Sequence, residues 1–203
     1  MNFIPILHPP KGTDRPQWWF LFQKDRILVC DEGDQPVRPF LTNVSAVESA
    51  LVRKQYLGHL NGTDCYTAEV VQDAMLPPNS TLRRIRWLLG EIGDDILAIA
   101  GRANQMVQWA KTHQYCGRCG HPTEDSHDER AKICNSCNLI NYPRISPAVI
   151  VAVINNRRIL LARSIRAKSS YHSVMAGFVE PGETLEDCVR REIKEEVGIR
   201  VKN

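Results

Sequence analysis

The spacing of hydrophobic and polar positions predicts strands in the first part of the chain and a helix after them. Residues 18–22 (WWFLF) and 26–30 (RILVC) read as two strands joined by a turn at Lys24–Asp25, and residues 66–71 as a further strand. From position 96, apolar residues recur every three or four positions, which predicts a core helix that Asp94 or Asp95 can cap. Its apolar positions are Ile96, Ile99, Ala100, Ala103, Met106, Val107 and Ala110.

A second group of elements is expected after position 147. Residues 148–154 form an uninterrupted apolar run, which is typical of a buried strand. Asn155–Asn156 suits a tight hairpin turn, so residues 159–162 are its expected partner strand.

A helix is predicted over residues 184–197. Val189, Ile193 and Val197 make one apolar stripe at 3.6 residues per turn. Thr184, followed three positions later by an aspartate, resembles a capping box, and Gly198 is suited to end the helix.

Composition adds only broad limits. Apolar residues make up 43% of the chain and charged residues 24%, as in an ordinary globular protein. The formal net charge of +3 does not by itself argue for binding to a nucleic acid or a membrane surface. The N-terminus lacks the pattern of a signal peptide, and the longest apolar run is too short to span a bilayer. We therefore expect a cytoplasmic protein with no DNA or membrane partner.

Four of the seven cysteines form two Cys-x-x-Cys pairs with fourteen residues between the pairs. This spacing predicts one structural zinc ion held by four thiolates, with no open coordination position. Nearby histidines at 113, 121 and 127 are alternative ligands, and redox chemistry is the alternative for a single pair. The four cysteines are Cys116, Cys119, Cys134 and Cys137.

Three carboxylates on the second helix point roughly one way. Glu192 and Glu196 are one turn apart, and Glu195 lies on the same arc. Like charges at this spacing destabilise a bare helix by a few tenths of a kcal/mol, roughly. A hard cation such as Mg²⁺, which prefers oxygen ligands, would neutralise them. The alternative is a solvated face on which neighbouring basic side chains balance the glutamates.

The stretch from 177 to 199 (GFVEPGETLEDCVRREIKEEVGI) resembles the Nudix box. Its fixed positions correspond to Gly177, Glu183, Arg191, Glu192, Ile193, Glu195, Glu196, Gly198 and Ile199. The resemblance implies hydrolysis of a nucleoside diphosphate linked to another group. It also implies that Glu192 and Glu196 hold Mg²⁺ or Mn²⁺, that Glu195 assists them, and that Arg191 braces the glutamates.

The wider pattern narrows the resemblance. A four-cysteine ribbon, then YPRISP at 142–147, a hairpin, and GFVE at 177–180 is similar to the NADH pyrophosphatase family, which also removes NAD caps from RNA. This resemblance implies cleavage of NAD(H) by water into NMN(H) and AMP. It implies that Phe178 stacks on a flat base, that Tyr142 reaches the substrate from the other subunit of a homodimer, that the Ala176 carbonyl binds metal, and that Glu129 contacts substrate. Ordinary packing is the alternative for Phe178 and Tyr142.

These patterns predict an α+β protein. We expect a β-rich N-terminal domain at 1–92, a linking helix at 93–113, a zinc ribbon at 114–142 and a Nudix domain at 143–203. The box ends four residues before the end of the sequence. The expected Nudix domain is therefore the first half of an α/β/α sandwich, and we expect a truncated chain whose own activity is open.

Two other functions remain compatible with the sequence. One is a Nudix hydrolase of another nucleotide conjugate, such as ADP-ribose or a nucleoside triphosphate. The other is a non-catalytic zinc-ribbon module that binds RNA or a protein.

Overall fold

The structure is a computed structural model that describes residues 2–12, 15–31, 33, 36–163 and 171–202. Its contacts divide the chain into two compact units, Met1–Pro143 and Arg144–Asn203. Both units combine helix and strand, which confirms the predicted α+β class. No helix in the described part of the chain combines the length and the apolar character needed to cross a membrane.

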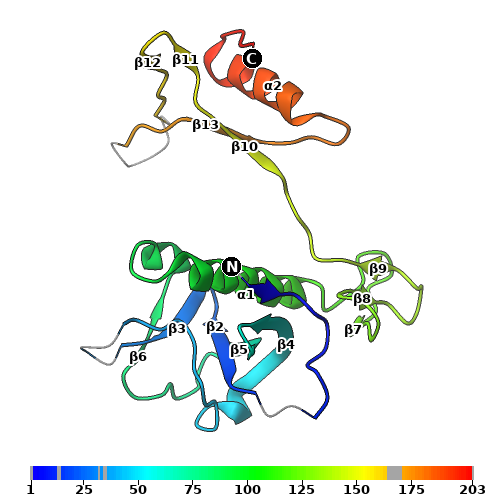
Figure 1. The fold of residues 1–203 in the computed structure, drawn as a ribbon. Coiled ribbons are helices and arrows are strands. Elements are labelled where there is room, and N and C mark those ends of the chain that lie inside the picture. Colours follow the sequence, from blue (N-terminus) through cyan, green and yellow to red (C-terminus); the bar gives the residue numbers. More distant parts are fainter. Residues whose placement is uncertain (1, 13–14, 32, 34–35, 164–170, 203) are drawn as a thin grey trace. The chain divides into compact units, whose positions relative to one another are not determined.

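The first unit is built on a six-stranded sheet (Figure 1). The strand order is β1-β4-β5-β2-β3-β6, in which β2 and β5 run parallel and the other neighbours run antiparallel. The strands are β1 (Phe3–Ile4), β2 (Gln17–Gln23), β3 (Arg26–Cys30), β4 (Leu51–Leu60), β5 (Thr63–Val70) and β6 (Ser80–Arg83). Two 3₁₀ turns, η1 (Glu48–Ala50) and η2 (Ile85–Leu88), lie in the connections.

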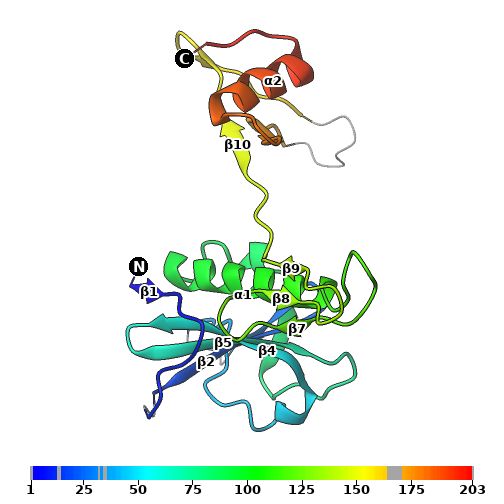
Figure 2. The same ribbon diagram turned by 90° about the vertical axis from the view of Figure 1, so that its right-hand side faces the viewer.

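Helix α1 (Asp94–Thr112) packs across one face of this sheet (Figure 2). Side chains alternate along β2, so Phe20 and Phe22 join the core beneath α1 while Leu21 joins a second core on the opposite face. All three are fully buried. The sheet is therefore covered on both faces, and α1 belongs to the core of the unit.

Most of the predicted elements of this unit are confirmed. Strands β2 and β3 enclose the predicted turn at Lys24–Asp25, and β5 contains most of the third predicted strand. The apolar helix positions pack as expected, with Ile96 half-buried and the other six buried. The predicted cap was wrong: Gly93 is the N-cap residue of α1 and makes no side-chain cap, while Asp94 and Asp95 lie in the first turn. Their charges still favour the positive end of the helix dipole.

A small three-stranded sheet follows α1. It consists of β7 (Glu124–Asp125), β8 (Lys132–Ile133) and β9 (Ile140–Asn141). Arg130 ties this sheet to the larger one, because its guanidinium donates to the carbonyl of Tyr56 in β4 at 2.8 Å and to that of Ile6 at 3.0 Å. The ribbon region is thereby anchored to main-chain groups of the N-terminal sheet.

The second unit holds two short sheets and one helix. Strand β10 (Ala148–Val151) pairs with β13 (Met175–Phe178), and β11 (Ile154–Asn155) pairs with β12 (Arg158–Ile159). Helix α2 (Leu185–Val197) packs against β13 and β10. Its core in the described residues is small and consists of Val149, Met175, Cys188 and Ile193.

One expectation for this unit was wrong, and another is confirmed in part. The apolar run at 148–154 is not one buried strand, because β10 ends at Val151, pairs with β13, and leaves Ile150 77% exposed. The reason is that α2 covers one face of the β10–β13 pair, so alternate residues of β10 stay exposed. The predicted hairpin is present at the end of the run, where Ile154 pairs with Ile159, but its turn falls one residue later, at Asn156–Arg157.

A buried charge in the first unit generates a stability prediction. Glu69 in β5 is buried and accepts hydrogen bonds from Arg53 at 2.7 Å and from Lys111 of α1 at 2.7 Å. Burial raises the pKa of Glu69, but these two cations outweigh it and hold the pKa below its usual value. Because the folded-state pKa is lowered, the contribution to stability is present at neutral pH and is lost as the pH falls below about 4.5.

We expect Glu69→Gln to lower the free energy of unfolding by about 1–3 kcal/mol at pH 7, since two charge-assisted bonds are lost. The matched control is Glu48→Gln, whose partner Lys54 lies 3.5 Å away in an exposed pair, and it should cost less than about 1 kcal/mol. Urea unfolding at pH 7 and pH 4 measures both. An equal loss in the two variants would contradict the prediction.

Candidate functional site

The four predicted zinc cysteines come together in the ribbon. Their sulfur atoms lie within 4.8 Å of one another, with Cys116–Cys137 and Cys119–Cys137 at 3.5 Å and Cys119–Cys134 at 3.4 Å. A tetrahedral zinc ion with bonds of about 2.3 Å separates its sulfur ligands by about 3.8 Å. The cluster therefore has the size and the soft donors of a structural zinc site. No histidine in the described ranges joins it.

The two Cys-x-x-Cys loops have the same backbone structure. The Cys116 carbonyl accepts from Gly120 N at 2.9 Å, and the Cys134 carbonyl accepts from Asn138 N at 2.8 Å. Gly120 and Asn138 have φ of +76° and +57°, a left-handed conformation that glycine and asparagine tolerate best. Each loop thus turns sharply after its second cysteine, and this turn brings both sulfurs of a pair to the same point.

Helix α2 begins and ends where the sequence predicts. The Thr184 hydroxyl accepts from Asp187 N at 3.1 Å and donates to the Asp187 carboxylate at 2.7 Å. Gly198 ends the helix in the left-handed conformation, with φ of +73°. Ile193 is fully buried, and Val189 and Val197 are half-buried beside it. The apolar stripe therefore fixes which face of the helix presents its glutamates.

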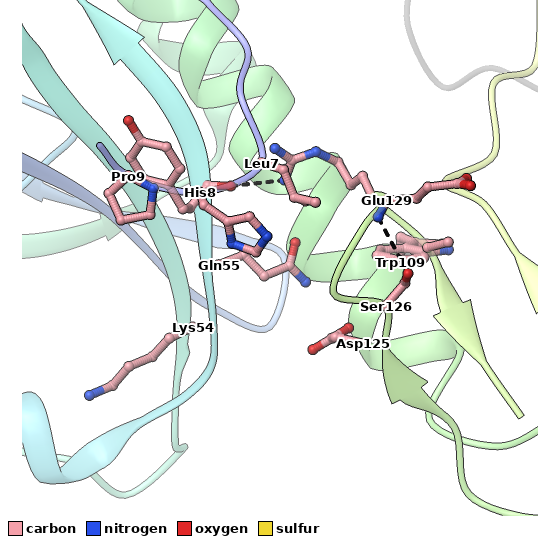
Figure 3. Close-up of a pocket in the computed structure, with 12 residues that line it drawn as sticks. Leu7, His8, Pro9, Lys54, Gln55, Trp109, Asp125, Ser126 and Glu129 are labelled. Atoms are coloured by element: carbon pink, nitrogen blue, oxygen red, sulfur yellow. Dashed lines mark hydrogen bonds between the residues drawn. The ribbon is translucent and has the colours of Figure 1, made fainter. Parts of the chain in front are cut away.

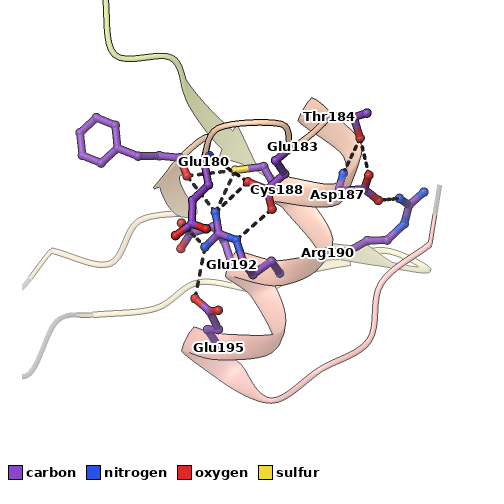
Figure 4. Close-up of polar contacts among 10 residues, drawn as sticks. Glu180, Glu183, Thr184, Asp187, Cys188, Arg190, Glu192 and Glu195 are labelled. Carbon is purple, nitrogen blue, oxygen red and sulfur yellow. Dashed lines mark hydrogen bonds and ion pairs between the residues drawn. The ribbon is translucent and has the colours of Figure 1, made fainter.

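Arg191 is the centre of a polar network on α2, and its partners Glu183, Glu192 and Glu195 are labelled in Figure 4. Its guanidinium bonds to both oxygens of Glu183 at 2.9 Å, which is a bidentate ion pair. Its Nη1 donates to Glu192 at 3.0 Å and lies 3.3 Å from Glu195. Nη2 also donates to the main-chain carbonyl of Phe178 at 2.9 Å. One side chain therefore connects the helix, the loop before it and the end of β13.

The charges in this network reinforce one another. The hydrogen bonds from Arg191 and from the main-chain N of Glu180 lower the pKa of Glu183 to about 2. The pKa of Arg191 is raised in turn, first by Glu183 and then by Glu192. Both groups of the pair are therefore ionised at neutral pH.

Gly177 makes room for Glu192. A Cβ added at Gly177 would overlap the carboxylate end of the Glu192 side chain. The φ of Gly177 is not in the left-handed region, so the glycine is needed for space and not for backbone conformation. The carboxylate of Glu192 consequently lies against β13 at Gly177, which directly follows Ala176 in the chain.

The three glutamates supply suitable ligands for a divalent cation, but their side chains do not converge here. Three carboxylates within about one helical turn, with one of them in the space left by Gly177, fit a hard cation chemically. In the described residues, however, only the four cysteines bring three or more ligand atoms to one point. Arg191 lies between Glu192 and Glu195, and Glu196 is exposed. Joint ligation of one ion requires Glu195 or Glu196 to change rotamer.

Phe178 lies at the edge of an open groove. Its side chain is 65% exposed, so the ring contributes little to the core of the second unit. The groove has a volume of about 470 Å³ and is lined by residues 145–147 and 178–181. Two groups hold the carbonyl of Phe178, the Arg191 guanidinium and the thiol of Cys188 at 3.4 Å. The main chain under this exposed ring is therefore fixed.

Tyr142 and Glu129, the other two expected substrate contacts, form a pair in the first unit. The Tyr142 hydroxyl donates to the Glu129 carboxylate at 2.6 Å, and this bond raises the pKa of Tyr142. The phenol therefore stays protonated, and its ring is 53% exposed.

Glu129 also lines a pocket of about 220 Å³ bounded by the N-terminal segment, β4 and the ribbon (Figure 3). His8 and Gln55 lie on one side of the pocket, and Trp109 and Ser126 lie on the other. His8 Nε2 lies 2.7 Å from the carbonyl of His127, so the N-terminal segment contacts the ribbon directly.

Two contributors to this arrangement were not predicted. Nothing in the sequence indicates the bond from the thiol of Cys188 to the carbonyl of Phe178. Glu183 is a fixed position of the box, but its spacing of eight residues from Arg191 does not reveal a bidentate pair between a loop and a helix.

Comparison of the chain with known protein families and proteins agrees with this geometry. Residues 144–203 match the NUDIX domain, residues 111–142 match the NADH pyrophosphatase zinc ribbon domain, and residues 16–109 match the NADH pyrophosphatase-like rudimentary NUDIX domain. A NAD-capped RNA hydrolase NudC from Pseudomonas fluorescens Pf-5 is 38% identical over 192 residues, which are 94% of this chain and 68% of that protein. The chain belongs to the NudC family.

Other NudC proteins give the same result. The protein from Chromobacterium violaceum is 38% identical over 95% of this chain and 69% of its own length. The one from Stutzerimonas stutzeri A1501 is 35% identical over 91% of this chain and 65% of its own length. The chain thus spans about two thirds of the length of these NudC relatives.

The space at Gly177 gives the first prediction for this NudC-family site. Gly177→Ala should lower the free energy of unfolding of the second unit by about 1–3 kcal/mol, because the new methyl group overlaps Glu192. In a background that carries Glu192→Ala, the same substitution should cost little, since the overlapping carboxylate is gone. Urea unfolding of the two singles and the double variant measures this cycle. Equal costs in both backgrounds would show that Glu192 does not occupy the space.

The ribbon gives a second prediction. We expect one zinc ion per chain by mass spectrometry of metals, and its loss in Cys134→Ser, because a serine hydroxyl is a poor replacement for a thiolate ligand. Cys30→Ser, which changes a cysteine outside the cluster, should keep the zinc. A zinc content that is unchanged in Cys134→Ser would contradict the assignment.

Proposed function

We propose that this chain hydrolyses the diphosphate bond of NAD(H), giving NMN(H) and AMP, and that it acts on NAD-capped RNA 5′ ends in the same way. The observation that carries the proposal is the network of Arg191 on α2, which fixes Glu183 and Glu192 beside β13 in a chain related to NAD-capped RNA hydrolases.

The three glutamates and the carbonyl of Ala176 are the proposed ligands of the catalytic Mg²⁺ or Mn²⁺. Such an ion would shield the diphosphate charge and lower the pKa of a bound water. Glu192 is already placed against β13 by the space at Gly177. The side chain of Glu195 is 60% exposed, and among the residues that the structure describes its one hydrogen-bond partner is Arg191, so it is the carboxylate best able to move a proton from water.

Substrate positioning is assigned to three side chains. Phe178 offers an exposed ring at the edge of the open groove described above. The flat ring of the nicotinamide or adenine can stack on this phenyl ring. Tyr142 and Glu129 offer a second ring and a carboxylate that can accept from a ribose hydroxyl. The proposal includes a homodimer, in which Tyr142 reaches substrate held by the other copy, and a location in the cytoplasm.

Chromatography of NADH after incubation with the protein tests this function. We expect AMP and NMNH in the presence of Mg²⁺ or Mn²⁺ and no turnover after chelation of the divalent ions. Glu195→Gln should lower kcat/KM by about 100-fold or more, because the carboxylate can no longer accept a proton. The matched control is Glu186→Gln, an exposed carboxylate in the first turn of the same helix, which should retain activity.

Two outcomes would contradict the proposed function. Hydrolysis of ADP-ribose with NADH left intact would contradict the proposed substrate. Full NADH turnover by Glu195→Gln would contradict the role given to Glu195.

A further inference from the structure

Basic side chains gather at one corner of the N-terminal sheet. Strand β3 pairs with β6 so that Ile27 lies opposite Arg83, which places the β2–β3 turn beside the chain that leaves β6. An ion pair of 3.3 Å between Asp25 and Arg84 joins the two segments. We define the basic corner by Lys24, Arg26, Arg83, Arg84, Arg86 and Trp87.

The charges of this corner are only partly compensated. Arg83 forms two bonds of 2.7 and 2.6 Å with Glu91, and Arg84 pairs with Asp25. Within the described part of the chain, the other three cations, Lys24, Arg26 and Arg86, form no ion pair, and all three are exposed. The corner therefore carries three uncompensated positive charges, as many as the formal net charge of the whole chain.

The basic corner also carries an exposed aromatic ring. Trp87 is 53% exposed, and the Arg84 guanidinium lies 5.9 Å from its ring centroid. The main chain beneath it is fixed, because Leu88 is fully buried in the core and Arg83 donates to the Trp87 carbonyl at 3.3 Å. Folding has thus fixed a large apolar ring in water at the basic corner, next to Arg84 and directly after Arg86 in the chain.

This composition suits a single-stranded nucleic acid. Proteins that hold single strands combine cations, which contact the phosphates, with exposed aromatic rings, on which bases stack. An arginine beside the ring adds a cation–π contribution. A protein partner would be favoured by a broader apolar surface, whereas the exposed large apolar side chains at this corner are Trp87 and its near neighbour Leu89.

We propose that the basic corner binds the RNA chain that follows a 5′ cap. This inference rests on the proposed function for the choice of RNA as substrate. It assigns affinity for the RNA chain to the N-terminal sheet, and it leaves cleavage of the diphosphate to the residues of α2. Free NAD(H) lacks the RNA chain, so the corner should contribute nothing to hydrolysis of the free dinucleotide.

The experiment uses a labelled single-stranded RNA of about twenty nucleotides in two forms, with a 5′ NAD and with a 5′ triphosphate. Fluorescence anisotropy at several salt concentrations gives the affinity of the 203-residue chain for each form. A triple variant, Lys24→Gln with Arg26→Gln and Arg86→Gln, should weaken binding of both RNAs about tenfold or more. The slope of log K against log salt should fall by about 2, as expected for three lost phosphate contacts.

Trp87→Ala tests the ring separately. It should weaken RNA binding about fivefold or more and leave the salt slope unchanged, because stacking releases no counterions. The matched control is Lys11→Gln, an exposed lysine outside the corner, which should bind RNA like the parent. Thermal unfolding of every variant shows whether the fold is kept, and NADH turnover should equal that of the parent.

The outcomes separate this inference from the proposed function. Unchanged RNA affinity in both corner variants would overturn the inference, even if NADH is hydrolysed. Unchanged RNA affinity with a loss of self-association in sedimentation would overturn it in favour of a contact between copies of the chain. Weakened RNA binding supports the inference, and a parent protein that leaves NADH intact contradicts only the proposed diphosphatase.

Discussion

The bidentate ion pair between Arg191 and Glu183 is the interaction on which the second unit depends most. The unit has few buried side chains in its described residues, so buried area alone cannot hold α2 in register with β13. Arg191 fixes the position of α2 on β13. Its guanidinium matches the carboxylate of Glu183 and still donates to Glu192 and to the carbonyl of Phe178. A lysine could not make these bonds together.

Local patterns in the sequence were sufficient for the helices and for strands β2, β3 and most of β5, but not for strand β4 or for the pairing of β10 with β13. The apolar periods of α1 and α2 follow from contacts three and four residues apart, so they are visible in the chain. Strand β4 was missed because charged and small residues interrupt it, and its neighbour β5 buries Glu69 only because Arg53 and Lys111 pair with it. The pairing of β10 with β13 joins segments more than twenty residues apart, and no short-range signal specifies it.

The sequence likewise predicts only part of the candidate site. The spacing of the cysteines sufficed to predict their cluster, and helical periodicity sufficed to place the three glutamates on one arc. The insertion of Arg191 between two of these glutamates, and the use of the space at Gly177 by Glu192, depend on packing between a strand and a helix. The bond between Tyr142 and Glu129 depends on how the ribbon folds, and the residues alone do not reveal it.

Arg130 connects the ribbon to the N-terminal sheet, and its chain neighbour is Glu129. The same short loop therefore carries both the anchor and the carboxylate that receives the Tyr142 hydroxyl. A zinc ion held by the four cysteines would order this loop together with the rest of the ribbon. Loss of the ion should therefore loosen the Arg130 anchor and the tyrosine–glutamate pair together, because both depend on the fold of the same short segment.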